Sequence, residues 1–133
     1  MEYRATPKDK WFAMHAHTAK IRDHINGPRL NYILSRNSGK WNQLCSSLDI
    51  VEDTQLAIDA YCAADDSADG TNRNVGQQYL ALYGLLQALF LQQDASAHLC
   101  EALDIPFDLK DFPRLDAIRD VRNASIGHPT KKG

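Results

Sequence analysis

The strongest constraint on the fold is a long stretch, residues 75–103, in which apolar side chains recur every three or four positions. This spacing is typical of one face of an α-helix. The predicted stripe consists of Val75, Tyr79, Leu82, Leu86, Leu89, Gln93, Ala97 and Cys100. Between residues 79 and 91 the stretch is apolar nearly all round, which indicates a helix packed on several sides by its own domain or by a second copy. No segment shows sustained alternation of β-branched and polar residues, so we expect an all-α fold.

Shorter segments repeat the helical spacing and are separated by turn residues. We expect further helical segments at residues 7–25, 29–36, 40–48, 52–64 and 114–126, of which 40–48 leads directly to 52–64. Leu56, Ala60 and Ala63 share one face. Pro113 suits the first turn of the last helix, and Gly127 suits a left-handed cap at its end. A chain of 133 residues can bury one core, so residues 1–133 should form a single up-down bundle of four or five helices.

Composition limits the partners and the compartment. The net charge of −2 lacks the excess of Lys and Arg that a general nucleic-acid coat protein needs, so any nucleic-acid contact must be local. The longest apolar run is too short to span a bilayer, and the N-terminal residues lack an apolar signal segment. Three cysteines in helical patterns suggest buried free thiols. We expect a soluble cytoplasmic protein with no membrane partner.

Metal and cofactor sites have little support in the sequence. His15 and His17 point to nearly opposite sides of a helix, whereas His17 and His24 share a face about 10 Å apart, too far to chelate one zinc ion. Solvated or interface histidines are the better interpretation. Hydrolase and phosphate-loop motifs are absent, so we expect neither a metal nor another cofactor.

The stretch RNASIGHP, residues 122–129, is the strongest candidate for a functional motif. Arg122 lies on the last turn of an amphipathic helix and the polar Asn123 follows it. Gly127 and Pro129 bracket His128, and Pro129 pushes this histidine out of the helical region. On one ideal helix Arg122 and His128 would diverge, but a helix that ends between them allows them to converge.

This motif, following the long helix over residues 75–103, resembles the HEPN superfamily of small all-α domains. The family signature is an arginine and a histidine with four to six residues between them, usually with a polar residue after the arginine. Arg122, Asn123 and His128 match these positions. The resemblance implies a homodimer with the two motifs facing one another across a cleft. Many members are metal-independent endoribonucleases, often toxins that have an antitoxin partner.

The implied chemistry is cleavage of RNA by its own 2′-hydroxyl group. His128 is suited to proton transfer near neutral pH, Arg122 can bind two phosphate oxygens, and Asn123 could orient the ribose. Two-fold symmetry would supply one histidine as base and one as acid. Asp94 could hold Arg122 or His128 in place.

Three alternatives remain open at this point. The motif residues also fit an ordinary helix end, where an arginine favours the helix dipole. Arg119, Arg122, Lys131 and Lys132 could bind phosphate without cleaving RNA, in a non-catalytic dimer that binds nucleotides, RNA or a protein. A small-ligand pocket could be lined by aromatic residues of several helices, namely Trp41, Tyr79, Tyr83 and Phe90.

Overall fold

The computed structural model describes residues 7–66 and 74–127, and this part of the chain contains helices and no strand. The helices are α1 (Pro7–Ile25), α2 (Pro28–Ser35), α3 (Ser38–Asp66), α4 (Val75–Ala102) and α5 (Pro113–Arg122). A short 3₁₀ helix, η2 (Leu109–Asp111), precedes α5, and a π-helical turn, η3 (Asn123–Gly127), follows it. The expected all-α class with five helices is confirmed for these residues.

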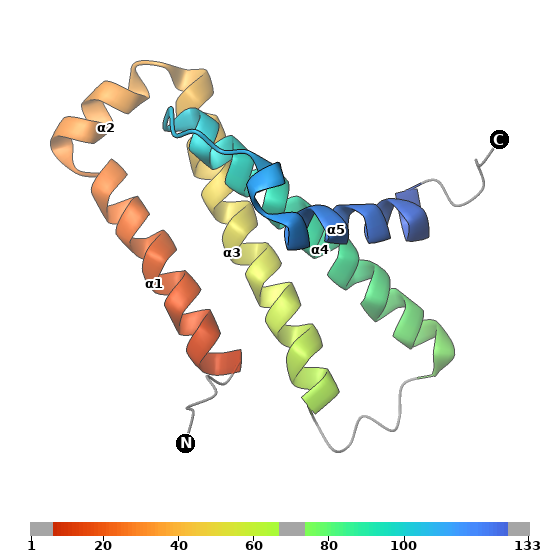
Figure 1. Cartoon of the computed structure of the whole chain (residues 1–133). Coiled ribbons are helices and arrows are strands. Elements are labelled where there is room, and N and C mark those ends of the chain that lie inside the picture. The colour runs from red at the N-terminus through yellow and green to blue at the C-terminus, as the bar shows by residue number, and fades with distance from the viewer. Residues whose placement is uncertain (1–6, 67–73, 128–133) are drawn as a thin grey trace, which may run out of the picture.

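Three long helices run up, down and up (Figure 1). α1 and α4 lie on either side of α3, the short α2 links α1 to α3 at one end, and α5 crosses α4. α3 and α4 are close together near α2 and diverge toward residues 66 and 75 (Figure 1). The arrangement leaves one closed end of the bundle, beside α2, and one open end.

The core lies at the closed end. Leu44 and Leu48 of α3 are 1% and 0% exposed, and they pack with Ile25 of α1 and Ala102 of α4. Along α3, Leu44, Leu48 and Val51 continue one buried stripe at helical spacing. This stripe crosses the interval at residues 49–51 between the helical segments expected at 40–48 and 52–64. The two segments form one helix, because the interval has neither Gly nor Pro and burial of Val51 stabilises the continuous helix.

Helix ends follow local chemistry. α4 begins with a capping box, in which Asn74 Oδ1 accepts the backbone N–H of Gln77 and Gln77 Oε1 accepts that of Asn74. It ends with Asp104 in the left-handed region at φ 56°, and the backbone N–H of Ile105 bonds to the carbonyl of Cys100 at 2.8 Å. Pro113 starts α5, as expected. After α5 the backbone continues through the π-helical turn η3 instead of adopting the expected left-handed cap at Gly127.

The open end exposes apolar residues that the helical pattern had assigned to packing. On α4, Val75, Tyr79 and Leu82 belong to the predicted stripe but are exposed, and Leu80 is 74% exposed. On α3 the predicted face of Leu56, Ala60 and Ala63 is also exposed. α4 therefore packs on several sides only from about Leu86 onward. The cysteines depart from expectation too, since Cys62 is exposed and Cys45 and Cys100 are only partly buried.

Candidate functional site

The Arg-Asn pair of the terminal motif lies where α5 gives way to η3. Arg122 is the last residue of α5, and Asn123 is the first of η3. His128, predicted as the catalytic histidine, lies outside the described residues, as do Lys131 and Lys132. The structure thus describes the arginine side of the predicted site and the helix that carries it.

Arg122 is held by uncharged partners. Its Nη1 donates to Asn123 Oδ1 at 3.0 Å, and its Nη2 donates to Gln87 Oε1 of α4 at 3.2 Å. Its Nε–H is buried and has no partner in the described part of the chain. No carboxylate within this part bonds to Arg122, so its positive charge is oriented but not neutralised.

A phenylalanine ring supports this arginine and a second one. The guanidinium carbons of Arg119 and Arg122 lie 4.1 and 4.2 Å from the centroid of the Phe90 ring, within the range of cation–π attraction. Arg119 also donates to Asp94 Oδ1 at 2.7 Å. Asp94, predicted to hold Arg122 or His128, instead binds Arg119. The four described site residues, Arg119, Arg122, Asn123 and Asp94, do form one cluster between α4 and α5.

One buried glutamine anchors α5 onto α4 beside this cluster. Gln93 is 6% exposed, and its Nε2 donates to the backbone carbonyl of Leu115 at 3.2 Å. The sequence interpretation had placed Gln93 on the apolar stripe of the long helix and Phe90 in a small-ligand pocket, and it had not identified Gln87 as a site residue. Helical spacing could have identified Gln87 and Phe90, because they share a face of α4 with Asp94. Arg119 and Arg122 likewise share a face of α5.

A second polar cluster joins α1 to α3. Arg22 Nη2 lies 2.6 Å from Asp49 Oδ1 and 3.4 Å from Glu52 Oε2. Burial acts to raise the pKa of Glu52, but hydrogen bonds from Thr18 and Arg22 and the charges of Arg22 and His15 outweigh it and lower that pKa. Burial acts to lower the pKa of Arg22, but the hydrogen bonds and charges of Asp49 and Glu52 outweigh it and raise that pKa.

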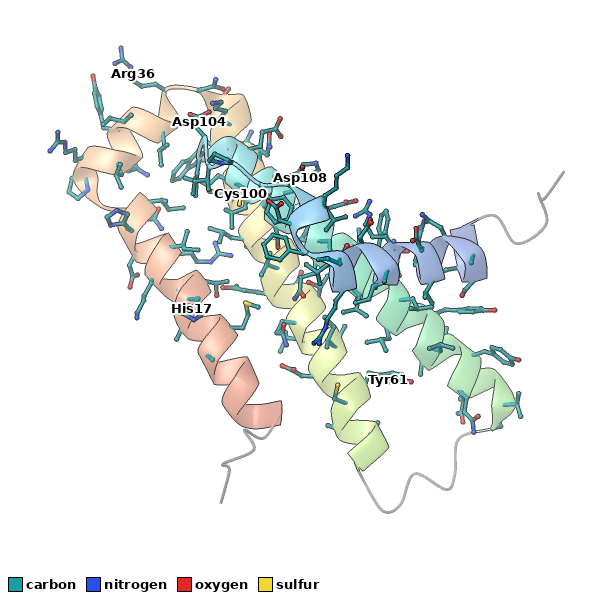
Figure 2. The ribbon with its side chains drawn as sticks, viewed as in Figure 1. His17, Arg36, Tyr61, Cys100, Asp104 and Asp108 are labelled. Carbon is teal, nitrogen blue, oxygen red and sulfur yellow. The ribbon has the colours of Figure 1, made fainter. Side chains whose placement is uncertain are left out.

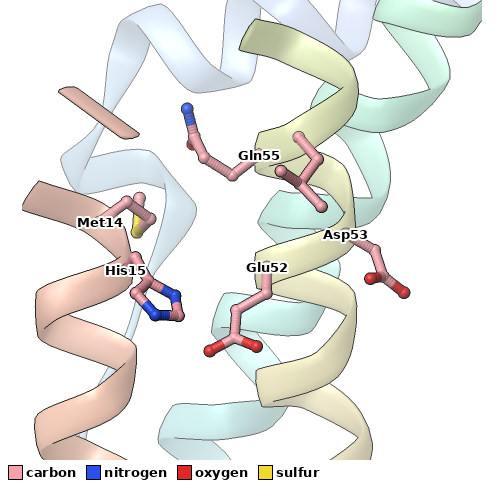
Figure 3. A pocket seen from close by; sticks show the side chains of 6 residues that line it. Met14, His15, Glu52, Asp53 and Gln55 are labelled. Carbon is pink, nitrogen blue, oxygen red and sulfur yellow. The ribbon is translucent and has the colours of Figure 1, made fainter. Parts of the chain in front are cut away.

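A small cavity of about 160 Å³ adjoins this second cluster (Figure 3). His15 of α1 lies beside Glu52 of α3 at its mouth, whereas Asp53 points away (Figure 3). The cavity holds little more than a few water molecules, and both carboxylates bound to Arg22 serve to join the two helices. We regard this cluster as structural. Among the residues the structure covers, no three His, Cys, Asp or Glu side chains are grouped to hold a metal ion.

The aromatic residues proposed to line one pocket lie in three different environments. Tyr79 and Tyr83 are neighbours on the exposed first half of α4, with ring centroids 6.0 Å apart. Phe90 contacts the two arginines, and Trp41 packs against the core cluster at the closed end. These four side chains do not form a common ligand site.

Comparisons with known proteins do not assign this chain to a family. No protein-family model, curated protein or solved structure matches it. None of the helices within residues 7–66 and 74–127 is both long and apolar enough to cross a membrane. The function must therefore be argued from the geometry of the cluster between α4 and α5.

Proposed function

We propose that this chain is a metal-independent endoribonuclease of the HEPN type that acts as a homodimer. The observation that supports this proposal is the state of Arg122. Its guanidinium rests on Phe90 and is held by two neutral amides, with one buried N–H unpartnered. Stabilising a phosphorane transition state requires a cation that is already oriented and whose charge is not neutralised by a carboxylate.

The reaction would be an internal transesterification of RNA. The 2′-hydroxyl oxygen attacks phosphorus, the bond from phosphorus to the 5′-oxygen breaks, and the products carry a 2′,3′-cyclic phosphate and a 5′-hydroxyl. In this scheme His128 of one copy removes the 2′ proton, and His128 of the second copy protonates the leaving oxygen. Arg122 binds the non-bridging oxygens as negative charge builds on them, while Asn123 holds the guanidinium and can contact the ribose.

The decisive experiment is cleavage of a mixed RNA pool in EDTA. Four proteins are compared after circular dichroism shows equal folding: wild type, His128→Ala, Arg122→Gln and Arg114→Gln. Arg114 is exposed on the same helix, so its replacement removes one charge without touching the cluster. We expect cyclic-phosphate products from wild type and from Arg114→Gln, and about a hundredfold slower cleavage by the other two variants.

Two results would contradict this proposal. Absence of cleavage by wild type between about pH 6 and 8, where a histidine can act, would refute catalysis. Cleavage that persists in His128→Ala, or that disappears in EDTA and returns with a divalent ion, would refute the mechanism. RNA binding without cleavage, lost in Arg122→Gln and retained in Arg114→Gln, would indicate a phosphate-binding module instead.

A second candidate, a non-catalytic interaction module, is favoured by the apolar surface at the open end. Leu80 and Tyr79 of α4 are 74% and 56% exposed. Beside them a groove of about 260 Å³ separates α3 from α4, and Tyr61 points from α3 into it (Figure 2). Surfaces of this kind are typical of protein interfaces. Because the proposed ribonuclease is also a dimer, sedimentation of wild type and Leu80→Glu tests this candidate together with the cleavage assay. A dimer that the glutamate dissociates, in a protein that does not cleave RNA, would support it, whereas a monomeric wild type would show that the surface does not pair two copies.

A further inference from the structure

Another cavity lies at the closed end, away from the arginine cluster. It has a volume of about 520 Å³, within the range of small-molecule sites in proteins. Five aliphatic residues line it, contributed by α1, α2 and the end of α4: Ile21, Ile25, Leu30, Leu34 and Leu103. Four of them, all except Leu30, belong to the core or pack against it, so the cavity is an extension of the hydrophobic core that protein atoms do not fill.

Two basic side chains complete the lining. Lys20 and His24 lie one turn apart on α1, on the same face as Ile21 and Ile25. Both are exposed, and neither side chain has a partner within the described residues. The described lining includes no carboxylate, and Asp104, next in sequence to Leu103, is bound to Lys40 at 2.9 Å. No carboxylate of the described lining therefore balances these basic side chains at the cavity.

The wall formed by α2 is the least buried part of this region. α2 has eight residues and none of them is buried. Its outer side carries the exposed Tyr32 and Ile33, and Arg36 just after it points away from the bundle (Figure 2). Leu30 and Leu34 on the inner side are only half covered. A short helix depends on tertiary packing, so an occupant that buries these leucines would stabilise it.

From this combination we propose that the cavity binds a small anionic amphiphile, a medium-chain carboxylate of the fatty-acid class. The hydrocarbon chain lies against the aliphatic side chains, and the carboxylate accepts hydrogen bonds from Lys20 Nζ and from the imidazole of His24. The carboxylate supplies the missing negative charge, and the chain covers the inner face of α2. This site is independent of the ribonuclease proposal, because it shares no residue with the cluster between α4 and α5.

Calorimetric titration of the purified full chain tests the proposal with three probes at fixed ionic strength: octanoate, 1-octanol and acetate. Octanoate has both the chain and the charge, octanol lacks the charge, and acetate lacks the chain. We expect saturable one-to-one binding of octanoate, binding of octanol at least tenfold weaker, and no binding of acetate. Octanoate should also raise the melting temperature of the protein.

Variants locate the ligand. Leu30→Gln puts a polar group against the hydrocarbon chain of the ligand and should abolish octanoate binding. Ile33→Gln, on the outer side of α2, should leave octanoate binding unchanged. Lys20→Gln should weaken octanoate about tenfold and leave octanol unaffected, with Lys110→Gln as the control for charge.

Three results would overturn the proposal. They are the absence of saturable octanoate binding at millimolar concentration, equal affinity in the wild type and Leu30→Gln, and equal affinity for octanoate in the wild type and Lys20→Gln. Dissociation of a wild-type dimer by Leu30→Gln would also overturn it, because a second copy would then be the occupant of the cavity.

Discussion

The guanidinium carbon of Arg122 lies 4.2 Å from the centroid of the Phe90 ring, and that of Arg119, one turn earlier on α5, lies 4.1 Å from the same centroid. One aromatic side chain of α4 thus orients two like charges of α5. Their other partners differ, since Arg119 is paired with Asp94 and Arg122 is held by Gln87 and Asn123. The charge of Arg119 is neutralised and that of Arg122 is not.

Replacing the Phe90 ring should destabilise the protein, because the variant loses the cation–π contacts with Arg119 and Arg122 as well as packing contacts. In a double-mutant cycle of Phe90→Leu with Arg122→Gln, we expect a coupling free energy of about 0.5–1 kcal/mol, measured by urea unfolding. Phe112→Leu is the control, because Phe112 stacks on Phe107, whereas both arginines make their cation–π contact with Phe90. A coupling of zero between Phe90 and Arg122 would mean that the ring does not support the guanidinium.

Asp94→Asn and Arg122→Gln should change nucleic-acid affinity in opposite directions. The first releases the charge of Arg119 and should tighten binding of a non-cleavable 2′-O-methyl RNA, whereas the second should weaken it by about three- to tenfold. Arg122→Gln should also reduce the slope of log affinity against log salt by about one. Fluorescence anisotropy measures both effects, with Asp116→Asn on the exposed side of α5 as the control. Weaker binding by Asp94→Asn would indicate that the ion pair serves only to hold the fold.

Acid should destabilise the junction between α1 and α3. The pKa of Glu52 is lowered in the folded chain, so its contribution to stability is present above the pKa of the unfolded chain, near 4.3, and is lost as pH falls through the lower folded value. In Glu52→Gln the fall in unfolding free energy below about pH 4.5 should be shallower than in wild type. Asp53→Asn, which removes the neighbouring exposed carboxylate, is the matched control for the loss of one negative charge from α3. Identical profiles for wild type and Glu52→Gln would contradict the assignment.

At the end of α4, the energetic cost of the positive φ at Asp104 can be separated from the contribution of its ion pair with Lys40. Asp104 adopts a positive φ and also binds Lys40, but its side chain is 81% exposed, so the pair contributes little. Asp104→Gly relieves the strain and Asp104→Ala does not, while both remove the pair. We expect the glycine variant to be about 1 kcal/mol more stable than the alanine variant in thermal or urea unfolding. Equal stabilities would show that the left-handed conformation costs nothing here.

Periodicity and turn residues in the sequence determined the all-α class, the boundaries near Pro28 and Pro113, and the extent of the long helix before Asp104. These properties depend on contacts within a few residues along the chain, so a single sequence carries them. The candidate site had other sources: Arg122 and Asn123 came from the resemblance of residues 122–129 to a family motif, and Asp94 came from the order of the helices along the chain. Arg119 was added as a further basic residue near the end of the last helix.

Only the tertiary structure decided which arginine Asp94 binds, that Phe90 and Gln87 belong to the cluster, and that α3 continues through residues 49–51. It also decided that the apolar stripe of α4 is exposed from Val75 to Leu82 and buried or half-buried from Leu86 onward. The physical reason is that helical spacing shows which residues share a face, but the crossing of α5 over α4 and the divergence of α3 from α4 determine what each face meets.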